Sequence, residues 1–409
     1  MIFDDFFRKK FQLGNKLWLY TIAIITGALC GYFNMLQPIA AFISNVFIKM
    51  FKCLSLPIIV ISVTVALSQQ GSNASLKKMG KQSLIYALLT TIIASSVACI
   101  LYLLISPSNI ANVPIGTAQD IPAGKYSDYV LNIIPSNIFS PFLENNVMEA
   151  LFLGIVTGLA VKVLPDVGSK TMHDFFKIIH EMLLIIIGWV VKILPIAIFG
   201  FITTAVVQLK SSEAIKGLSS YLCVIIFANT IQASIILPIF LYLNKINPWR
   251  SFKAMMPALS IAFFSKSSAG TLPVTMNVAE KNLGISRSTS RFVLPLCTAI
   301  NMNGCAAFIF TSVVYVMQNH GISIGLVTMI QWIFISTIAA IGNAGVPMGC
   351  FFLSLSLLAS LNVPFDILWL ILPFYSVIDM VETALNVWSD CCITKIVDKN
   401  VHLSESTPN

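Results

Sequence analysis

The chain has 409 residues, of which 57% are hydrophobic and only 10% are charged, and its mean hydropathy is +0.86. Several apolar runs, for instance 17–36, 83–105 and 222–243, are long enough to cross a bilayer, which excludes an ordinary water-soluble protein. The net charge of +8 does not indicate nucleic-acid binding, because Lys and Arg gather in short loops on one side of the predicted membrane. We therefore expect an all-α polytopic membrane protein.

In chain order, the predicted elements are long spans interrupted by two broken segments. We expect no cleavable signal peptide, because residues 1–16 are charged and a full span follows them. The eight spans cover residues 17–36, 40–68, 83–106, 139–165, 174–207, 219–243, 289–317 and 365–395. The broken segments, 253–283 and 325–361, each consist of two apolar arms that are too short to cross a bilayer alone.

The charges of the loops indicate the topology. If the N-terminus lies inside, the basic loops 69–82, 162–177 and 244–250 lie inside as well. The basic loop 280–292 and the C-terminal tail join them only if both broken segments enter and leave by the same face. The pattern predicts eight transmembrane helices plus two re-entrant helical hairpins. Both termini are then cytoplasmic, in a plasma membrane such as a bacterial inner membrane.

The two broken segments belong to a faint internal repeat. The tip SSAGTLP at 267–273 precedes a span that contains NMNG at 301–304, and the tip GNAGVP at 342–347 precedes a span that contains DMVETALNVWSD at 379–390. The hairpins open from opposite faces, which is the inverted-repeat pattern of secondary transporters. Unpaired backbone at membrane depth is tolerated only where it is buried in protein or lines a cavity. We therefore expect a binding site where the tips meet.

The last span carries the strongest candidate residues. At about 100° per helical residue, five polar residues share one face about 100° wide, whereas Trp388 points away. A charged group at membrane depth costs roughly 3 kcal/mol and usually marks an ion or substrate pathway. No Lys or Arg lies on this span before Lys395, so the face favours Na⁺, H⁺ or a substrate ammonium group. The five residues are Asp379, Glu382, Thr383, Asn386 and Asp390.

Two further motifs offer ligands. Asn301 and Asn303 supply amide oxygens beside Gly304, where a helix can unwind and free its carbonyls for a hard cation. Ser267 and Ser268 stand at the start of the second arm of the first hairpin, and a helix N-terminus suits a carboxylate.

The nine cysteines lie almost all within apolar runs and form no C-x-x-C pair. Free Cys at such positions usually packs as a small hydrophobic residue. We therefore expect packing rather than redox or metal binding from them.

Four motifs carry a resemblance to a known family. SKSSAGTLPVT, LPLCTAINMNG, NAGVP and DMVETALN occur in the order and spacing of the dicarboxylate/amino acid:cation symporter family. The resemblance implies the glutamate-transporter (elevator) fold, in a homotrimer with a fixed scaffold and a moving transport domain. Residues 1–250 would be mainly scaffold and trimerisation region, with spans 83–106 and 219–243 associated with the transport domain. Residues 251–395 would be the core of that domain, and 396–409 a cytoplasmic tail.

The resemblance also implies roles for single residues. Asp379 would hold the substrate α-ammonium, and no organic cofactor is expected beside the coupling ion, Na⁺ or H⁺. The implied substrate contacts are Ser267, Ser268, Gly345, Val346, Asp379, Glu382, Thr383, Asn386 and Cys305. The implied sodium ligands are Asn301, Asn386, Asp390 and the carbonyl of Cys297 at one site, and Thr90, Thr91 and Asn303 at another.

Three positions depart from the family pattern. Glu382 stands where members with acidic substrates carry Arg, and a carboxylate there repels an acidic side chain, as in the similar serine/threonine:sodium branch. Asn303 replaces the Asp of the family's NMDG motif, so a charged ion ligand is missing. Lys266 stands where many microbial members carry Arg, and it could pair with Glu382 or face water.

The sequence therefore predicts a cation-coupled symporter of a small neutral amino acid, most similar to the serine/threonine type, working by alternating access. An acidic amino acid or dicarboxylate, or a cationic amino acid held by Glu382, is an alternative substrate. A channel fits less well, because two capping hairpins suit alternating access. An intramembrane hydrolase fits least, since HEML at 180–183 lacks the second His of a zinc motif.

Overall fold

The computed structural model describes residues 17–68, 74–110, 134–144, 147–208, 212–343, 348–361 and 363–405. Throughout these residues the secondary structure is helical. The first helices are α2 (Leu17–Tyr32), α3 (Gln37–Ser68), α4 (Ala74–Ile105), α6 (Ser140–Glu144), α7 (Val147–Val163), α8 (Asp166–Lys192) and α9 (Leu194–Gln208). There follow α10 (Ser212–Ile231), the π-helix η2 (Gln232–Ile236), α11 (Leu237–Leu243), α12 (Pro248–Ser265), α13 (Ser268–Asn282), α14 (Arg287–Ile300), α15 (Asn303–Asn319), α16 (Leu326–Ile341), α17 (Gly349–Ser360) and α18 (Asp366–Glu405).

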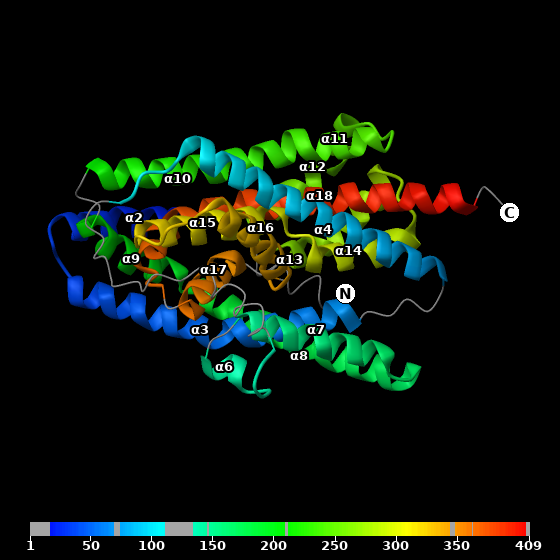
Figure 1. Cartoon of the computed structure of the whole chain (residues 1–409), viewed down its shortest axis with the longest axis horizontal. Coiled ribbons are helices and arrows are strands. Elements are labelled where there is room, and N and C mark those ends of the chain that lie inside the picture. Colours follow the sequence, from blue (N-terminus) through cyan, green and yellow to red (C-terminus); the bar gives the residue numbers. More distant parts are fainter. Residues whose placement is uncertain are drawn as a thin grey trace.

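Most helices run along the long axis of the molecule and form two packed groups (Figure 1). In the first group, α2, α3, α7, α8 and α9 pack mainly on one another. In the second group, α4, α10 and α12 to α18 pack around α15 and α18. The groups meet, for example, where Phe201 of α9 stacks on Trp369 of α18, with ring centroids 4.9 Å apart.

The first broken segment is a helical hairpin, as the sequence predicts. Its arms α12 and α13 pack against each other. Lys266, with a left-handed φ of 55°, ends α12, and Ser267, with an extended φ of −143°, begins α13. The Ser267 side chain accepts a hydrogen bond from the backbone N–H of Gly270 at 3.0 Å, which is the cap that a helix N-terminus requires.

The second broken segment consists of α16 and α17, both of which pack against α15. Met348, with φ of 63°, precedes the first residue of α17. The tip between the arms, residues 344–347, lies outside the described residues, and with it the predicted substrate contacts Gly345 and Val346.

The predicted span 289–317 is interrupted inside the NMNG motif. Asn301 (ψ 82°) and Met302 (ψ 64°) leave the helical region and separate α14 from α15. The prediction that the helix unwinds beside Gly304 is therefore confirmed two to three residues before that glycine.

By length and composition, three helices in the described part of the chain could cross a membrane: Lys78–Ile105, Lys216–Leu243 and Arg287–Asn319. A fourth is added if Asp366–Leu372 and Phe374–Val401, bent by 72°, count as one span. The predicted span 174–207 divides into α8 and α9 around Ile193. Pro195 explains the division, because proline has no N–H to donate and clashes with the preceding turn.

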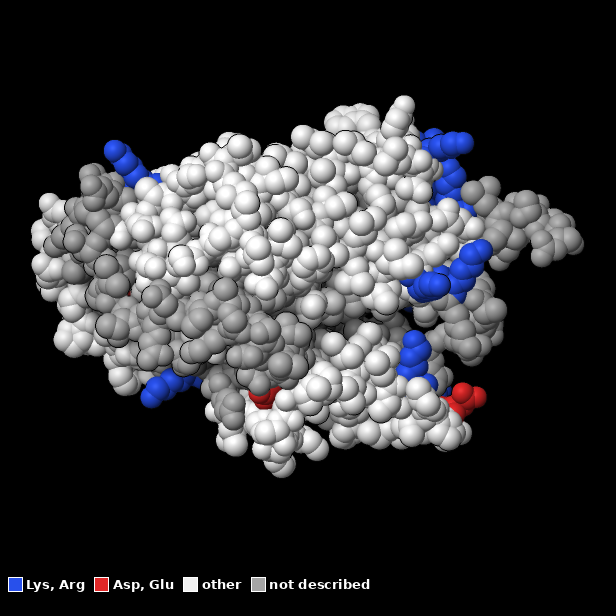
Figure 2. All heavy atoms as spheres, in the orientation of Figure 1, with Lys and Arg blue, Asp and Glu red and all other residues white. Residues whose placement is uncertain are grey.

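Helix α18 continues past the predicted end at residue 395 as far as Glu405. The continuation is packed rather than free, because Ile396 and Val397 are buried among side chains of the second group. Most Lys and Arg side chains visible in Figure 2 lie at the same end of the molecule as the C-terminus, and few acidic atoms appear on that face. Four acidic side chains of α18 are buried instead: Asp379, Glu382, Asp390 and Asp398.

Candidate functional site

The polar face of α18 is buried along its whole length. Its five members are exposed by 5% or less: Asp379, Glu382, Thr383, Asn386 and Asp390. Trp388 lies instead in a hydrophobic cluster, where its ring meets Phe252 edge-on and its indole N–H donates to the carbonyl of Ala233 at 3.3 Å. The predicted division of this helix into a polar face and an opposite apolar face is therefore confirmed.

Asp379 connects α18 to the second hairpin. One of its carboxylate oxygens, Oδ2, accepts the backbone N–H of Met348 at 3.2 Å. Thr383, one turn later, donates its hydroxyl to the Asp379 carbonyl at 2.7 Å, so that hydroxyl is used within its own helix. The start of α17 thus sits directly on the carboxylate predicted to hold an ammonium group.

Asp390 lies against the break between α14 and α15. Its Oδ1 accepts the side-chain amide of Asn301 at 2.9 Å, and its Oδ2 accepts the hydroxyl of Thr298 at 3.1 Å. The backbone N–H of Asn301 donates to the carbonyl of Cys297 at 2.7 Å. Three of the four members of this implied sodium set, Asn301, Asp390 and Cys297, therefore lie together, whereas the side-chain oxygen of the fourth, Asn386, accepts the N–H of Gly304.

The side-chain oxygen of Asn301 is the centre of a wider polar cluster. This Oδ1 atom accepts from Asn303 Nδ2 at 2.7 Å, from Thr90 Oγ1 at 3.1 Å and from Ser389 Oγ at 3.3 Å. Thr91 is buried beside Thr90, but its hydroxyl donates to the carbonyl of Ala87 in its own helix. Neutral and anionic oxygens gathered in this way are the ligand type that hard cations prefer.

Gln232 belongs to the same cluster and was not anticipated. Its side-chain amide donates to Asn303 Oδ1 at 2.6 Å and to the Thr90 carbonyl at 3.1 Å. It opens the π-helix η2, and π-helical turns are frequent at functional sites. A polar amide in the apolar run 222–243, which holds Gln232 and Asn229, is the signal in the sequence that could have pointed to it.

Gly304 lets α15 and α18 approach closely. Its backbone N–H donates to Asn386 Oδ1 at 2.9 Å. A Cβ at this position would lie 2.9 Å from the Cα atom of Glu382, a distance that real Cβ atoms essentially never show. The glycine of NMNG is thus needed for contact between the helices as well as for the break in the chain.

The first hairpin places a buried cation near this face. Lys266 is only 8% exposed, and its ammonium group donates to the hydroxyl of Ser376 on α18. The prediction that Lys266 could face water is therefore wrong. Ser267 and Ser268 beside it are also buried, at the start of α13.

Two cysteines are joined, against the expectation that all nine only pack. Cys305 on α15 and Cys350 on α17 form a disulfide whose Cα atoms are 5.3 Å apart. The residues are 45 positions apart in the chain, so no local spacing indicated the pair. Of the remaining cysteines in the described residues, Cys53 and Cys223 are exposed, and the others are buried or partly buried.

The geometry defines a class of protein: a helical membrane protein with broken helices and buried carboxylates, which are features of secondary transporters. A model of the sodium:dicarboxylate symporter family matches residues 17–400. The chain belongs to this family, and it is a multi-pass membrane transporter rather than an enzyme.

Curated relatives agree over most of the chain. It is 25% identical to the human neutral amino acid transporter B(0), over 90% of this chain and 75% of the relative. It is 26% identical to the human excitatory amino acid transporter 2, over 97% of this chain and 80% of the relative. It is 24% identical to a putative sodium-dependent excitatory amino acid transporter of Caenorhabditis elegans, over 95% of this chain and 90% of the relative.

Proposed function

We propose that the protein is a sodium-coupled symporter of a small neutral amino acid of the serine/threonine type. The observation that carries the choice of substrate is Glu382, which is 1% exposed and lies about one helical turn from Asp379 on the same face. A carboxylate in a site of low dielectric constant repels an acidic side chain strongly. The same carboxylate can accept a hydrogen bond from a substrate hydroxyl.

In this proposal the substrate lies between α18 and the two hairpin tips. Asp379 binds the α-ammonium group, because a buried charge-assisted hydrogen bond is among the strongest that a protein offers. Backbone N–H groups at Ser267 and Ser268 bind the α-carboxylate at the start of α13, where the helix dipole is positive. Gly345 and Val346 close the second tip over it. The side chains of Asn386, Thr383 and Cys305 line the rest of the proposed substrate site.

The coupling sodium ions travel with the substrate. Asp390, Asn301 and Asn386, with the Cys297 carbonyl, supply oxygens for one ion, which suits a hard cation. Thr90, Thr91 and Asn303 supply a second set. Asn303 brings no charge where the family's NMDG motif has one, so fewer ions are expected to be coupled than in members with that motif, and H⁺ is the alternative coupling ion.

The transport cycle that we propose is of the elevator type, in a homotrimer within a bacterial inner membrane. In this proposal the chain has eight spans and two re-entrant hairpins, and both termini are cytoplasmic. Residues 251–395, with spans 83–106 and 219–243, form the moving domain, and the rest of 1–250 the scaffold. The packing of α4 and α10 with α12 to α18, apart from α2, α3 and α7 to α9, supports this division.

The name of the family, sodium:dicarboxylate symporter, favours an acidic amino acid or dicarboxylate as the second candidate. A cationic amino acid paired with Glu382 is the third. The three are separated by uptake of labelled serine into proteoliposomes, with and without an inward sodium gradient, in competition with excess threonine, glutamate or arginine. Threonine alone competes if our proposal is correct. Strong competition by glutamate refutes it in favour of the second candidate, and stronger competition by arginine supports the third.

A further inference from the structure

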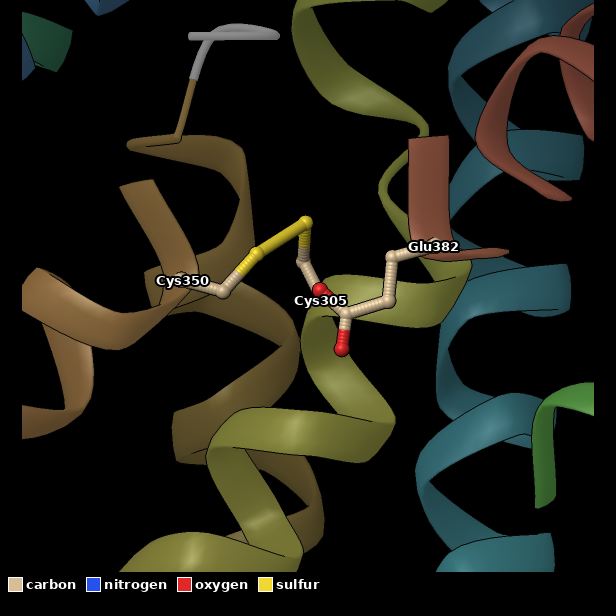
Figure 3. Close-up of side chains that lie close together, drawn as sticks. All are labelled: Cys305, Cys350 and Glu382. Atoms are coloured by element: carbon tan, nitrogen blue, oxygen red, sulfur yellow. A yellow bond between two sulfur atoms is a disulfide. The ribbon is translucent and has the colours of Figure 1, made fainter. Parts of the chain in front are cut away.

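A second group of ligand-type side chains lies beside the carboxylate of Glu382. Cys305 is in the first turn of α15, Cys350 in the first turn of α17, and Glu382 in the middle of α18. All three are buried, and one ligand atom from each lies within 4.8 Å of the other two. Figure 3 shows the three side chains converging from their separate helices.

The carboxylate of Glu382 is only partly used by the protein. Its Oε2 accepts the hydroxyl of Tyr375 at 3.3 Å, whereas Oε1, within the described part of the chain, has no hydrogen-bond partner. The side chain is 1% exposed, so water does not supply the missing partner freely. A buried carboxylate oxygen without a donor costs free energy, which a ligand can recover.

Asn343, which lies beside the sulfurs, shows the same feature. Its Nδ2 lies 2.9 Å from Cys305 Sγ and 3.4 Å from Cys350 Sγ, and its Oδ1, among the residues described, is buried without a partner. The two ends of an amide are nearly equal in shape, so turning the amide over brings its oxygen to the sulfurs. Asn386 Nδ2 also approaches Cys305 Sγ, at 3.5 Å, and can support a thiolate there.

The disulfide between Cys305 and Cys350 is one of two covalent states open to this pair. Reduction by a dithiol or phosphine breaks the S–S bond with two electrons and two protons and gives two thiols. The Cα separation of 5.3 Å then leaves both sulfurs facing the same point. In a reducing compartment thiols persist, and the pair offers two soft ligands next to an unsatisfied carboxylate.

We propose that the reduced pair Cys305 and Cys350, together with Glu382, forms a site for a thiophilic divalent cation such as Zn²⁺. Cysteine thiolates and Glu carboxylates are both ligands that Zn²⁺ takes, and the amide oxygen of Asn343 completes a tetrahedron. Na⁺ does not compete well for sulfur, so this site is chemically distinct from the oxygen cluster around Asn301. Each thiol that binds the ion releases its proton.

A cation bound there joins three helices. It holds the first turn of α17 to α15 and α18. Asp379 of α18 already accepts the N–H of Met348, which directly precedes α17. The consequence for transport rests on the proposed function: an ion that ties the second hairpin down prevents that hairpin from opening. Binding itself does not rest on it and can be measured without transport.

The test uses the full chain, purified in detergent under a phosphine reductant, with nine free thiols verified by alkylation after denaturation. Cd²⁺ is the probe, because its bond to a thiolate gives an ultraviolet charge-transfer absorption. We compare wild type with Cys350→Ser, Cys305→Ser and Glu382→Gln, and use Cys223→Ser as the matched control, because Cys223 is exposed on α10. Competition by Zn²⁺ is followed in each protein.

We expect wild type and Cys223→Ser to bind Cd²⁺ equally, with Zn²⁺ displacing it. Each of the other three variants should bind at least about tenfold more weakly, since even indirect ligand support is worth that much. Cd²⁺ should also raise the melting temperature of wild type and leave that of Cys350→Ser unchanged, because only the native site gains ligand stabilisation. If Cys350→Ser and Cys305→Ser each bind Cd²⁺ as tightly as wild type, the proposed site is wrong. If Glu382→Gln binds Cd²⁺ as tightly as wild type, the carboxylate is not a ligand.

Discussion

Replacing Gly304 by alanine tests the closest contact between α15 and the acidic helix. The added methyl carbon would lie 2.9 Å, 3.0 Å and 3.1 Å from the Cα, Cβ and Cγ atoms of Glu382. The Cα atom belongs to the backbone and cannot swing aside, so α15 and α18 have to separate. Overpacking of this kind costs about 1–3 kcal/mol.

Gly80 of α4 provides the matched control. Among the described residues, a Cβ there meets only the ring of Phe292, at 3.6 Å, which is an ordinary van der Waals distance. In a helix interior, alanine is more stable than glycine by about 0.5–1 kcal/mol. The same substitution should therefore lower the free energy of unfolding at position 304 and raise it at position 80, a difference of at least roughly 1.5 kcal/mol from the same two principles.

The free energy of unfolding is measured for both variants in detergent micelles by titration with a denaturing detergent, followed by circular dichroism. Uptake into proteoliposomes is measured at equal protein amount, and Gly304→Ala should lose activity because the Gly304 to Asn386 hydrogen bond of 2.9 Å is disturbed with the helices. A Gly304→Ala protein as stable and as active as Gly80→Ala would refute the close approach of α15 and α18.

The remaining predictions concern the carboxylates of α18. Asp379→Asn should reduce amino-acid uptake at least about tenfold, since a buried charge-assisted pair is worth more than about 1.4 kcal/mol, and wild-type uptake by this variant would remove Asp379 from the site. Asp390→Ala should raise the sodium concentration needed for half-maximal uptake, whereas uptake that ignores sodium but follows a proton gradient contradicts the sodium assignment. Glu382→Arg should shift competition from serine toward glutamate, and an unchanged order of competitors would show that Glu382 does not face the substrate side chain.

Features that depend on local sequence could be predicted. The Gly- and Ser-rich tip at 267–273 ends one arm and begins the next because it supplies a cap, and NMNG breaks a helix because amides and glycine stabilise the helix poorly. The polar face of α18 follows from the helical period alone, and all five members are buried as that period requires.

Features that depend on how helices pack against each other could not be predicted from the sequence. Gln232, Thr298 and Ser389 join the oxygen cluster through partners on other helices. Cys305 and Cys350 meet only because α17 packs on α15. Lys266 was left with two alternatives, since its partner Ser376 lies 110 positions away in the chain. Each of these contacts depends on how the helices pack, and neither the helical period nor the spacing of residues along the sequence predicts that packing.

The oxygen cluster around Asn301 also has a mechanical consequence. Its hydrogen bonds fasten α4, through Thr90, to η2, to the break before α15 and to α18, through Ser389. A slip of one helix by a single residue is about 1.5 Å, enough to break bonds of this length. A force applied to any one of these four segments is therefore transmitted to the other three. Because of the cluster, the four segments move as one rigid unit.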